Sequence, residues 1–200
     1  MTEPCVKGSM LLGTVVSVRR LRDSGDLPIG IFEKALSEDT LALFDERIII
    51  TSWYPMWQFN ELQELSWEHI SNRDPDKVRE AGALSFKSMA KTGRYQQFEY
   101  AERAEKANSK ADVLRDTRLI TSIMSGYYNF LEVESRLDPE TSDLQIIYEN
   151  AGLYIEPLRL STEGFMTAVS RVRNGTTDWT SKRTAPDRIV FTLPNANLPK

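Results

Sequence analysis

The sequence predicts an α+β fold, with helices packed on one face of an antiparallel sheet. Two observations support this prediction: amphipathic helical stretches collect in the middle of the chain, and short β-branched or aromatic runs lie towards its two ends. A chain of 200 residues, 40% of them hydrophobic, is long enough to bury a core and short enough for one domain. We therefore expect a single domain over residues 1–193, followed by a polar tail over residues 194–200.

The N-terminal third begins with an apolar segment and continues in short helices. Residues 6–18 are rich in Val, Leu, Met and Thr and contain two glycines, which favours a partly buried strand over a helix. In residues 27–36 the apolar side chains recur at helical spacing, and Pro28 suits a first helical turn. Residues 41–44 fit a further helical turn, while residues 47–51 fit either extended chain or the end of a helix.

Three longer helices are predicted in the middle of the chain. Residues 56–71 have an apolar face opposite three glutamates. A second helix is predicted over residues 74–93, because aspartate followed by proline is a typical cap and first helical position. Residues 94–110 are polar, which indicates a solvent-facing helix or a mobile connection. A third apolar stripe at helical spacing occupies residues 113–124.

The period of the apolar residues changes in the C-terminal third. Residues 128–137 and 144–148 are short aromatic and β-branched runs joined by a turn-prone acidic segment, which predicts a hairpin. Ser161 is expected to cap a helix that ends at residues 174–175. The inward face of this helix is predicted to consist of Phe165, Val169 and Val172. Residues 189–193 predict a last strand, which should join the hairpin and the N-terminal strand in one antiparallel sheet.

The composition excludes several broad classes of function. The net charge of −4 does not supply the positive field that a non-specific nucleic-acid binder uses. No run is apolar enough for a membrane span, and the N-terminus lacks the pattern of a signal peptide. The single cysteine, Cys5, can form no internal disulfide. We expect a cytoplasmic protein without membrane association.

Basic residues nevertheless gather at three places in the sequence. These are Arg19, Arg20 and Arg22, then Arg171 and Arg173, and finally Lys182, Arg183 and Arg188. If the fold brought these side chains together, they could bind nucleic acid or another acidic partner. Binding through such an arginine patch is a minor alternative to charges that are dispersed and solvated.

The sequence identifies no catalytic or metal-binding constellation. A Ser-His-Asp or Cys-His arrangement would have to include His69, the one histidine of the chain. This residue lies late in a predicted amphipathic helix without a flanking motif, where an exposed histidine is the simpler interpretation. No spacing typical of metal ligands occurs. We predict that the protein is not an enzyme and holds no metal. A hydrolase or transferase that depends on His69 is the alternative.

The most unusual local feature is an aromatic region that begins a predicted helix. It contains Trp53, Tyr54, Trp57 and Phe59, with Trp67 ten residues further along the helix than Trp57. Large rings supply apolar contact at little entropic cost, so they suit a ligand cavity or a protein interface. Core packing around the start of a helix is the competing interpretation. We predict that the first four residues form a surface for a protein partner, a second copy of the chain or a small apolar ligand.

Short blocks in order along most of the chain resemble known families. Val6-Lys7-Gly8-Ser9, Trp53-Tyr54-Pro55 before a helix, and Asp74-Pro75 leading to Gly82 resemble a paralogous myxobacterial family of unknown function. Later blocks resemble the end of the haem-NO-binding and vinyl-reductase-type ligand domains. These blocks are Gly126-Tyr127-Tyr128, a hairpin, Glu163-Gly164-Phe165 and Asp187-Arg188-Ile189-Val190-Phe191.

The resemblance implies an α+β domain that relatives use for small-molecule sensing or for assembly with other proteins, with no shared catalytic residue. Haem-containing relatives need an axial histidine and a Tyr-x-Ser-x-Arg cluster for the haem propionates. Neither His69 nor any Tyr-x-Ser-x-Arg stretch supplies these groups here, so we predict that the chain carries no haem or other cofactor. We predict a non-enzymatic sensory or adaptor module.

Overall fold

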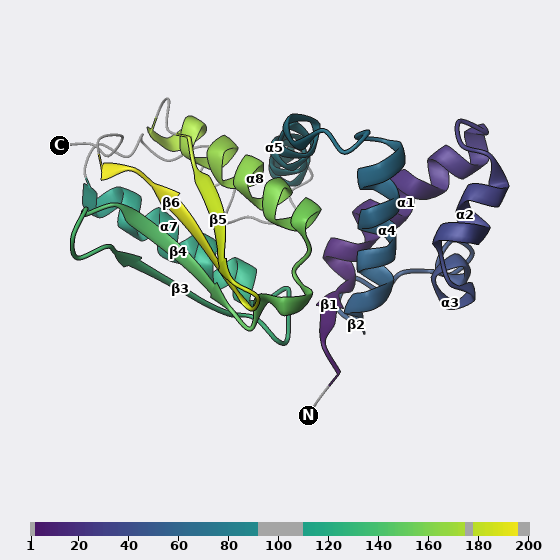
Figure 1. Cartoon of the computed structure of the whole chain (residues 1–200), viewed down its shortest axis with the longest axis horizontal. Coiled ribbons are helices and arrows are strands. Elements are labelled where there is room, and N and C mark those ends of the chain that lie inside the picture. The colour runs from purple at the N-terminus through teal and green to yellow at the C-terminus, as the bar shows by residue number, and fades with distance from the viewer. Residues whose placement is uncertain (1–2, 92–109, 175–177, 196–200) are drawn as a thin grey trace. The chain divides into compact units, whose positions relative to one another are not determined.

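A computed structural model describes residues 3–91, 110–174 and 178–195 (Figure 1). The fold is α+β, as the sequence predicts, and its strands form two antiparallel sheets. The chain divides into two compact units, which we describe separately. Unit 1 comprises residues 1–74 and 125–130, and unit 2 comprises residues 75–124 and 131–200.

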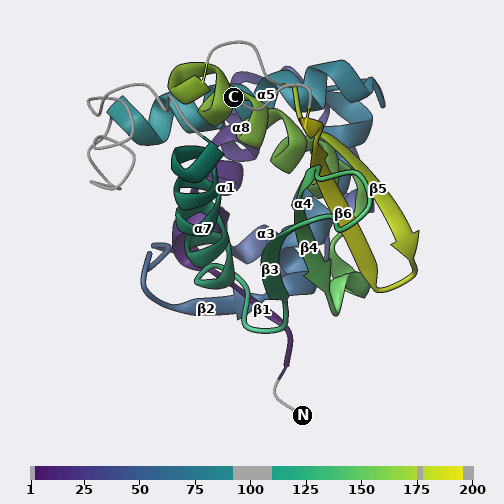
Figure 2. The same cartoon turned by 90° about the vertical axis from the view of Figure 1, so that its left-hand side faces the viewer.

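Unit 1 contains a small sheet at the N-terminal end of the chain. Strand β1 (Cys5–Lys7) pairs antiparallel with strand β2 (Trp53–Pro55), as Figure 2 shows. On its other side β1 is bridged to Tyr128 through Val6. The backbone N–H of Lys7 donates to the Tyr127 carbonyl at 2.8 Å. The segment at residues 125–130, distant in sequence, therefore completes this sheet.

The predicted strand over residues 6–18 is wrong for most of its length. Strand β1 ends at Lys7, and helix α1 (Gly8–Ser24) follows it at once. Its buried side chains, Leu11, Val15 and Val18, recur at helical spacing. β-branched residues lower helix propensity only slightly, so the burial of this stripe outweighs the local preference for a strand. The N-terminal strand consequently pairs with β2 and not with the C-terminal strands.

Three further helices complete unit 1. Helix α2 (Ile29–Ala35) and helix α4 (Met56–His69) confirm the helices predicted over residues 27–36 and 56–71. Helix α3 (Glu38–Ala42) begins earlier than the turn predicted at 41–44, because the Ser37 side chain caps it by accepting from the Thr40 N–H. The core that these helices share with α1 contains Phe32, Phe44, Phe59 and Leu62, each at most 2% exposed.

Unit 2 is built on a four-stranded antiparallel sheet in the order β3-β4-β6-β5 (Figure 2). Strands β3 (Glu132–Leu137) and β4 (Leu144–Glu149) are the predicted hairpin, and β6 (Arg188–Leu193) is the predicted last strand. Strand β5 (Thr180–Ala185) was not predicted, since its sequence is mostly polar and shows no alternating apolar face.

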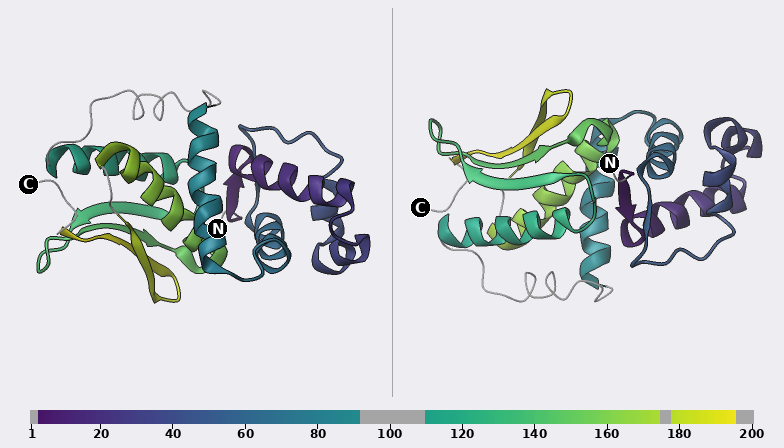
Figure 3. Two further views of the ribbon diagram at one scale, coloured as in Figure 1. Left: turned by 90° about the horizontal axis from the view of Figure 1, so that it is seen from above. Right: turned by 90° about the horizontal axis from the view of Figure 1, so that it is seen from below.

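Helices α7 (Lys110–Ser125) and α8 (Glu156–Asn174) lie on the same side of the four-stranded sheet, as both views in Figure 3 show. Helix α5 (Pro75–Lys91) packs against α8. The helices predicted over residues 74–93 and 113–124 are thus confirmed over their described parts. On the sheet the apolar layer includes Tyr148, Ile189 and Phe191, which are fully buried.

Two details of the predicted C-terminal helix are wrong. Ser161 does not cap α8, because the helix begins five residues earlier at Glu156. Val172 does not face inward, because it is 39% exposed, whereas Phe165 and Val169 are buried as predicted. The connection predicted over residues 94–110 lies almost entirely outside the described residues, as do Gly93, Gly175 and residues 196–200 of the tail.

Candidate functional site

The structure divides the four predicted surface residues into two exposed and two supporting side chains. Trp53 is 43% exposed and Trp57 is 40% exposed. Tyr54 is half-buried, and Phe59 is 1% exposed in the core. Phe59 is therefore a packing residue rather than part of a surface, because it lies on the inward face of α4.

Tyr54 supports the loop that precedes β2. Its hydroxyl accepts a hydrogen bond from the backbone N–H of Ile49 at 2.8 Å. The backbone N–H of Ser52 donates to the Ile49 carbonyl at 3.1 Å, which closes a tight turn. The Tyr54 side chain thus fixes the start of the turn that leads into β2.

Gly8 allows the same loop to lie directly on the start of α1. A Cβ at Gly8 would lie 2.2 Å from the Ile49 carbonyl oxygen and 2.9 Å from the Tyr54 ring. The Gly8 N–H donates to the Ser52 carbonyl at 2.9 Å, and the Ser9 N–H donates to the Ile50 carbonyl at 3.1 Å. Any larger residue at position 8 would displace the loop, so glycine is required here by close backbone contact.

The loop exposes two aliphatic side chains that were not predicted as part of a surface. Ile49 is 53% exposed and Ile50 is 50% exposed. Together with Trp53 and Trp57 they place four large exposed apolar side chains within nine residues. We call Ile49, Ile50, Trp53 and Trp57 the 49–57 patch. An unbroken Ile-Ile-Ile run is compatible with a buried strand, and the turn that follows it exposes its second and third members.

A lysine ammonium lies over one of the rings of this patch. The Nζ of Lys7 is 3.9 Å from the centre of the Trp53 ring, and it donates a hydrogen bond to the Thr51 carbonyl at 3.2 Å. Lys7 and Trp53 are cross-strand neighbours in the β1–β2 pair. The contact is a cation–π interaction, which holds both side chains in place.

In the part of the chain that the structure describes, His69 has no partner that would make it a catalytic base. It is the last residue of α4 and is half-buried. Within the described residues, its side chain makes no hydrogen bond to a serine, a cysteine or a carboxylate. Since a nucleophile and its base must lie within hydrogen-bond reach, the structure gives the enzyme alternative no support from geometry.

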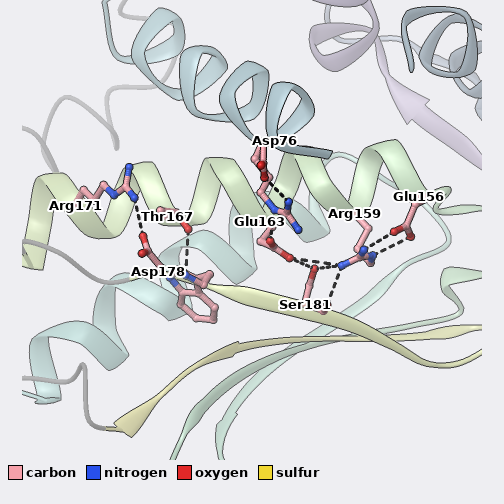
Figure 4. Close-up of polar contacts among 10 residues, drawn as sticks. Asp76, Glu156, Arg159, Glu163, Thr167, Arg171, Asp178 and Ser181 are labelled. Atoms are coloured by element: carbon pink, nitrogen blue, oxygen red, sulfur yellow. Dashed lines mark hydrogen bonds and ion pairs between the residues drawn. The ribbon is translucent and has the colours of Figure 1, made fainter. Parts of the chain in front are cut away.

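The other polar cluster of note joins α5, α8 and β5 in unit 2 (Figure 4). The Glu163 carboxylate, 7% exposed at its side chain, accepts from Arg79 Nε at 2.5 Å and lies 3.5 Å from Arg159 Nη1. The Ser181 hydroxyl also donates to Glu163. The same Arg159 nitrogen donates to the Ser181 carbonyl at 2.8 Å. A buried carboxylate is tolerated here because three donors surround it.

Two outer carboxylates complete this cluster. Glu156 accepts from Arg159 Nε at 2.9 Å, and Asp76 accepts from Arg79 Nη1 at 2.9 Å. The hydrogen bond from Arg159 holds the pKa of Glu156 below its usual value. Burial alone would lower the pKa of Arg79, but its contact with Glu163 raises it. The buried Glu163 carboxylate thus joins α5, α8 and β5, whereas the side chains of the outer Asp76 and Glu156 are 91% and 50% exposed.

Four of the basic residues that the sequence places in three groups make local polar contacts in the described structure. Arg22 pairs with Asp23 at 3.0 Å, Arg171 pairs with Asp178 at 2.7 Å, and Arg188 pairs with Glu149 at 2.8 Å. Arg183 donates to three backbone carbonyls, those of Ala151, Tyr154 and Pro186. Each of these four charges therefore has its own local partner.

Two structural findings concern metals and membranes. Over residues 3–91, 110–174 and 178–195, histidine, cysteine and carboxylate side chains nowhere gather in a group of three or more that could hold a metal ion. Among the helices that the structure describes, none combines the length and apolar character that crossing a bilayer requires.

This chain is similar to known proteins in structure but not detectably in sequence. No protein-family model matches this sequence, and no curated protein matches it significantly. An H-NOX protein from S. oneidensis in the Fe(II)NO state matches 94% of this chain and 97% of its own, with 12% identity and a TM-score of 0.52. Unliganded Fe(II) H-NOX from K. algicida matches with 11% identity over 94% and 95% of the two chains and a TM-score of 0.57. A mutant H-NOX from T. Tengcongensis matches with 10% identity over 93% and 96% and a TM-score of 0.51.

This chain has the H-NOX fold. The predicted resemblance to haem-NO-binding domains is confirmed at that level. The matches extend over both units, although none of them tests the resemblance to the myxobacterial family.

The H-NOX fold raises the question whether the residues of this chain fit a haem iron. His69 ends a helix and is half-buried, and among the described residues no hydrogen bond orients its ring. Burial and the nearby Glu3 charge raise the pKa of the Cys5 thiol, which disfavours the ligating thiolate. Burial and Tyr154 raise the pKa of Tyr148 well above its usual value, which disfavours the phenolate. None of these three side chains fits the role of axial ligand to a haem iron.

Proposed function

We propose that this chain is a non-enzymatic sensory or adaptor module, which binds a partner protein through the 49–57 patch of unit 1. One observation carries the proposal. Two tryptophans and two isoleucines are 40–53% exposed within nine residues, whereas large apolar side chains scattered singly need no explanation. Tryptophan is enriched among the residues that contribute most to binding, so this composition favours an interface.

The fixed backbone of the loop supports the same proposal. Hydrogen bonds from Gly8, Ser9 and Ile49 hold the segment before β2 in one conformation. A surface that is already ordered loses little entropy when it binds. The H-NOX fold agrees with a sensory role, since one of the matched structures has NO on its ferrous iron. The misfit of His69, Cys5 and Tyr148 to a haem iron favours the adaptor role over gas sensing at an iron centre.

Photo-crosslinking in the native cells tests this proposal. We would replace Trp57 with a photoreactive phenylalanine derivative and expect one dominant crosslinked partner. Ile29 is the matched control position, because it is an exposed apolar residue, 67% accessible, outside the patch. The partner's band should weaken when Trp53→Ala is added. Equal crosslinking from both positions, or none from position 57, would refute the proposal.

A further inference from the structure

We propose that the 49–57 patch receives a short segment of a partner protein, in which an apolar anchor is flanked by a carboxylate. This inference rests on the proposed function and specifies the chemistry of the partner. Three features of the patch carry it: its area, the position of Lys7 and the fixed loop beneath it.

The area of the patch favours a short segment over a second copy of the chain. A large side chain carries roughly 200 Å² of surface, and the four members of the patch are each about half exposed. They therefore offer roughly 400 Å² of apolar surface, whereas each subunit of an obligate homodimer buries about 1,000 Å² or more, roughly 65% of it apolar. A patch of this size matches the footprint of one peptide segment laid on an apolar surface.

The position of Lys7 supplies the polar part of the inference. Its ammonium lies 3.9 Å from the centre of the Trp53 ring. One of its three N–H groups donates to the Thr51 carbonyl. A segment that covers Trp53 removes water from this ammonium, and a charge that loses water without gaining a partner costs free energy. A carboxylate on the partner offsets that cost by accepting hydrogen bonds from the remaining N–H groups of Lys7.

The fixed loop explains why a small footprint can suffice. The Gly8 contact and the Tyr54 hydroxyl hold Ile49 and Ile50 in their exposed positions. Binding then requires no ordering of the loop, which lowers the entropic cost for this side of the interface. Only the partner segment then loses conformational entropy on binding. The two tryptophan rings provide the central contact.

The test uses three synthetic peptides of about 15 residues that place leucine at helical spacing. At all other positions one peptide carries glutamate, the second glutamine and the third lysine. Binding is followed by the indole N–H signals of Trp53 and Trp57 in NMR spectra of the full chain. We expect the glutamate peptide to shift both signals and to bind at least about tenfold more tightly than the glutamine peptide. The lysine peptide should bind most weakly.

Charge reversal on the protein provides the matched control. Lys7→Glu should invert the preference between the glutamate and lysine peptides, while Lys77→Glu, an exposed lysine on α5, should leave it unchanged. Equal binding of all three peptides would overturn the inference, and so would absence of binding. Concentration-dependent dimers lost in the Trp53→Ala and Trp57→Ala double variant would also overturn it. Crosslinking from position 57 without any charge preference would refute this inference and leave the proposed function standing.

Discussion

Gly82 of α5 lies against the backbone of Ser161 of α8, so closely that a Cβ at Gly82 would be 1.9 Å from the Ser161 carbonyl oxygen. The relation is reciprocal, because a Cβ at Gly164 would lie 1.9 Å from the Arg79 carbonyl oxygen. Two glycines thus let the helices touch backbone to backbone. This contact also brings Arg79 within reach of Glu163, since both charged residues lie one turn or less from the glycines.

Gly82→Ala should lower the free energy of unfolding by about 3 kcal/mol or more, because neither backbone can yield without separating the helices. Gly13→Ala is the control. Gly13 also lies in a helix, but nothing is within 4 Å of its Cβ position, so alanine there should raise the free energy of unfolding by about 0.5–1 kcal/mol. Urea denaturation measures both changes. Equal effects at the two positions would contradict the close contact.

Substitutions in the aromatic region should separate surface from core. Trp53→Ala and Trp57→Ala should each cost about 1–2 kcal/mol of unfolding free energy, because roughly half of each side chain is already in water. Phe59→Ala should cost about 3–5 kcal/mol, because it leaves a cavity in the core of unit 1. If the tryptophan double variant unfolds at room temperature, both rings are core residues and the 49–57 patch is not a docking surface.

Tyr148→Phe should stabilise the protein. The Tyr148 hydroxyl is fully buried and has no hydrogen-bond partner among the described residues, while its ring packs on Phe191 and Tyr154 at centroid distances of 4.9 and 5.3 Å. Removing the hydroxyl keeps the ring contacts and should raise the free energy of unfolding by about 1 kcal/mol. Urea denaturation at pH 7 measures the change, and a loss of stability of similar size would show that the hydroxyl is hydrogen-bonded.

The gain in stability from Tyr148→Phe should also depend on pH. Burial raises the pKa of Tyr148 in the folded protein above that in the unfolded chain, near 10. The native state therefore favours the protonated phenol, and stability is lost as pH rises from about 10 towards the folded pKa. The advantage of Tyr148→Phe over the parent should widen between about pH 9 and 11. A constant difference over this range would contradict the raised pKa.

Glu156 should show the opposite dependence on pH. Its hydrogen bond from Arg159 lowers its folded pKa, so its contribution is present above the unfolded value near 4.3 and is lost as pH falls through the folded one. Glu156→Gln should cost no more than about 1 kcal/mol at pH 7, because the carboxylate is half exposed. The free energy of unfolding of this variant is measured at pH 7 and near the acid transition. The control is Glu80→Gln, at an exposed position of α5. A deficit that persists at low pH would contradict this assignment.

The sequence predicts most of this fold because most elements follow their local apolar period. Helices α4 and α7 and the β3–β4 hairpin follow from it directly. The errors have long-range causes. The burial of Leu11, Val15 and Val18 makes α1 a helix where the local residues favour a strand. Strand β5 is joined to α8 through Ser181, whose hydroxyl donates to Glu163 and whose carbonyl accepts from Arg159. In the candidate site, composition alone selects Trp53 and Trp57. It does not select Ile49 and Ile50, because their exposure depends on Gly8 and Tyr54 elsewhere in the chain.

The last prediction concerns haem, which the H-NOX fold suggests and which His69, Cys5 and Tyr148 do not fit as axial ligands. Purified protein mixed with haem should give no stoichiometric Soret band, because a ligated haem needs an axial His, Cys, Met or Tyr in an apolar enclosure. Cys5 and Tyr148 have raised pKa values that disfavour their anionic, ligating forms, and His69 is half-buried at a helix end. Adding haem should also leave the melting temperature unchanged, since a group that does not bind the native state cannot stabilise it. The decisive comparison is with His69→Ala: a stoichiometric band in the parent that disappears in this variant would make the histidine an axial ligand and a haem-based sensor the leading function.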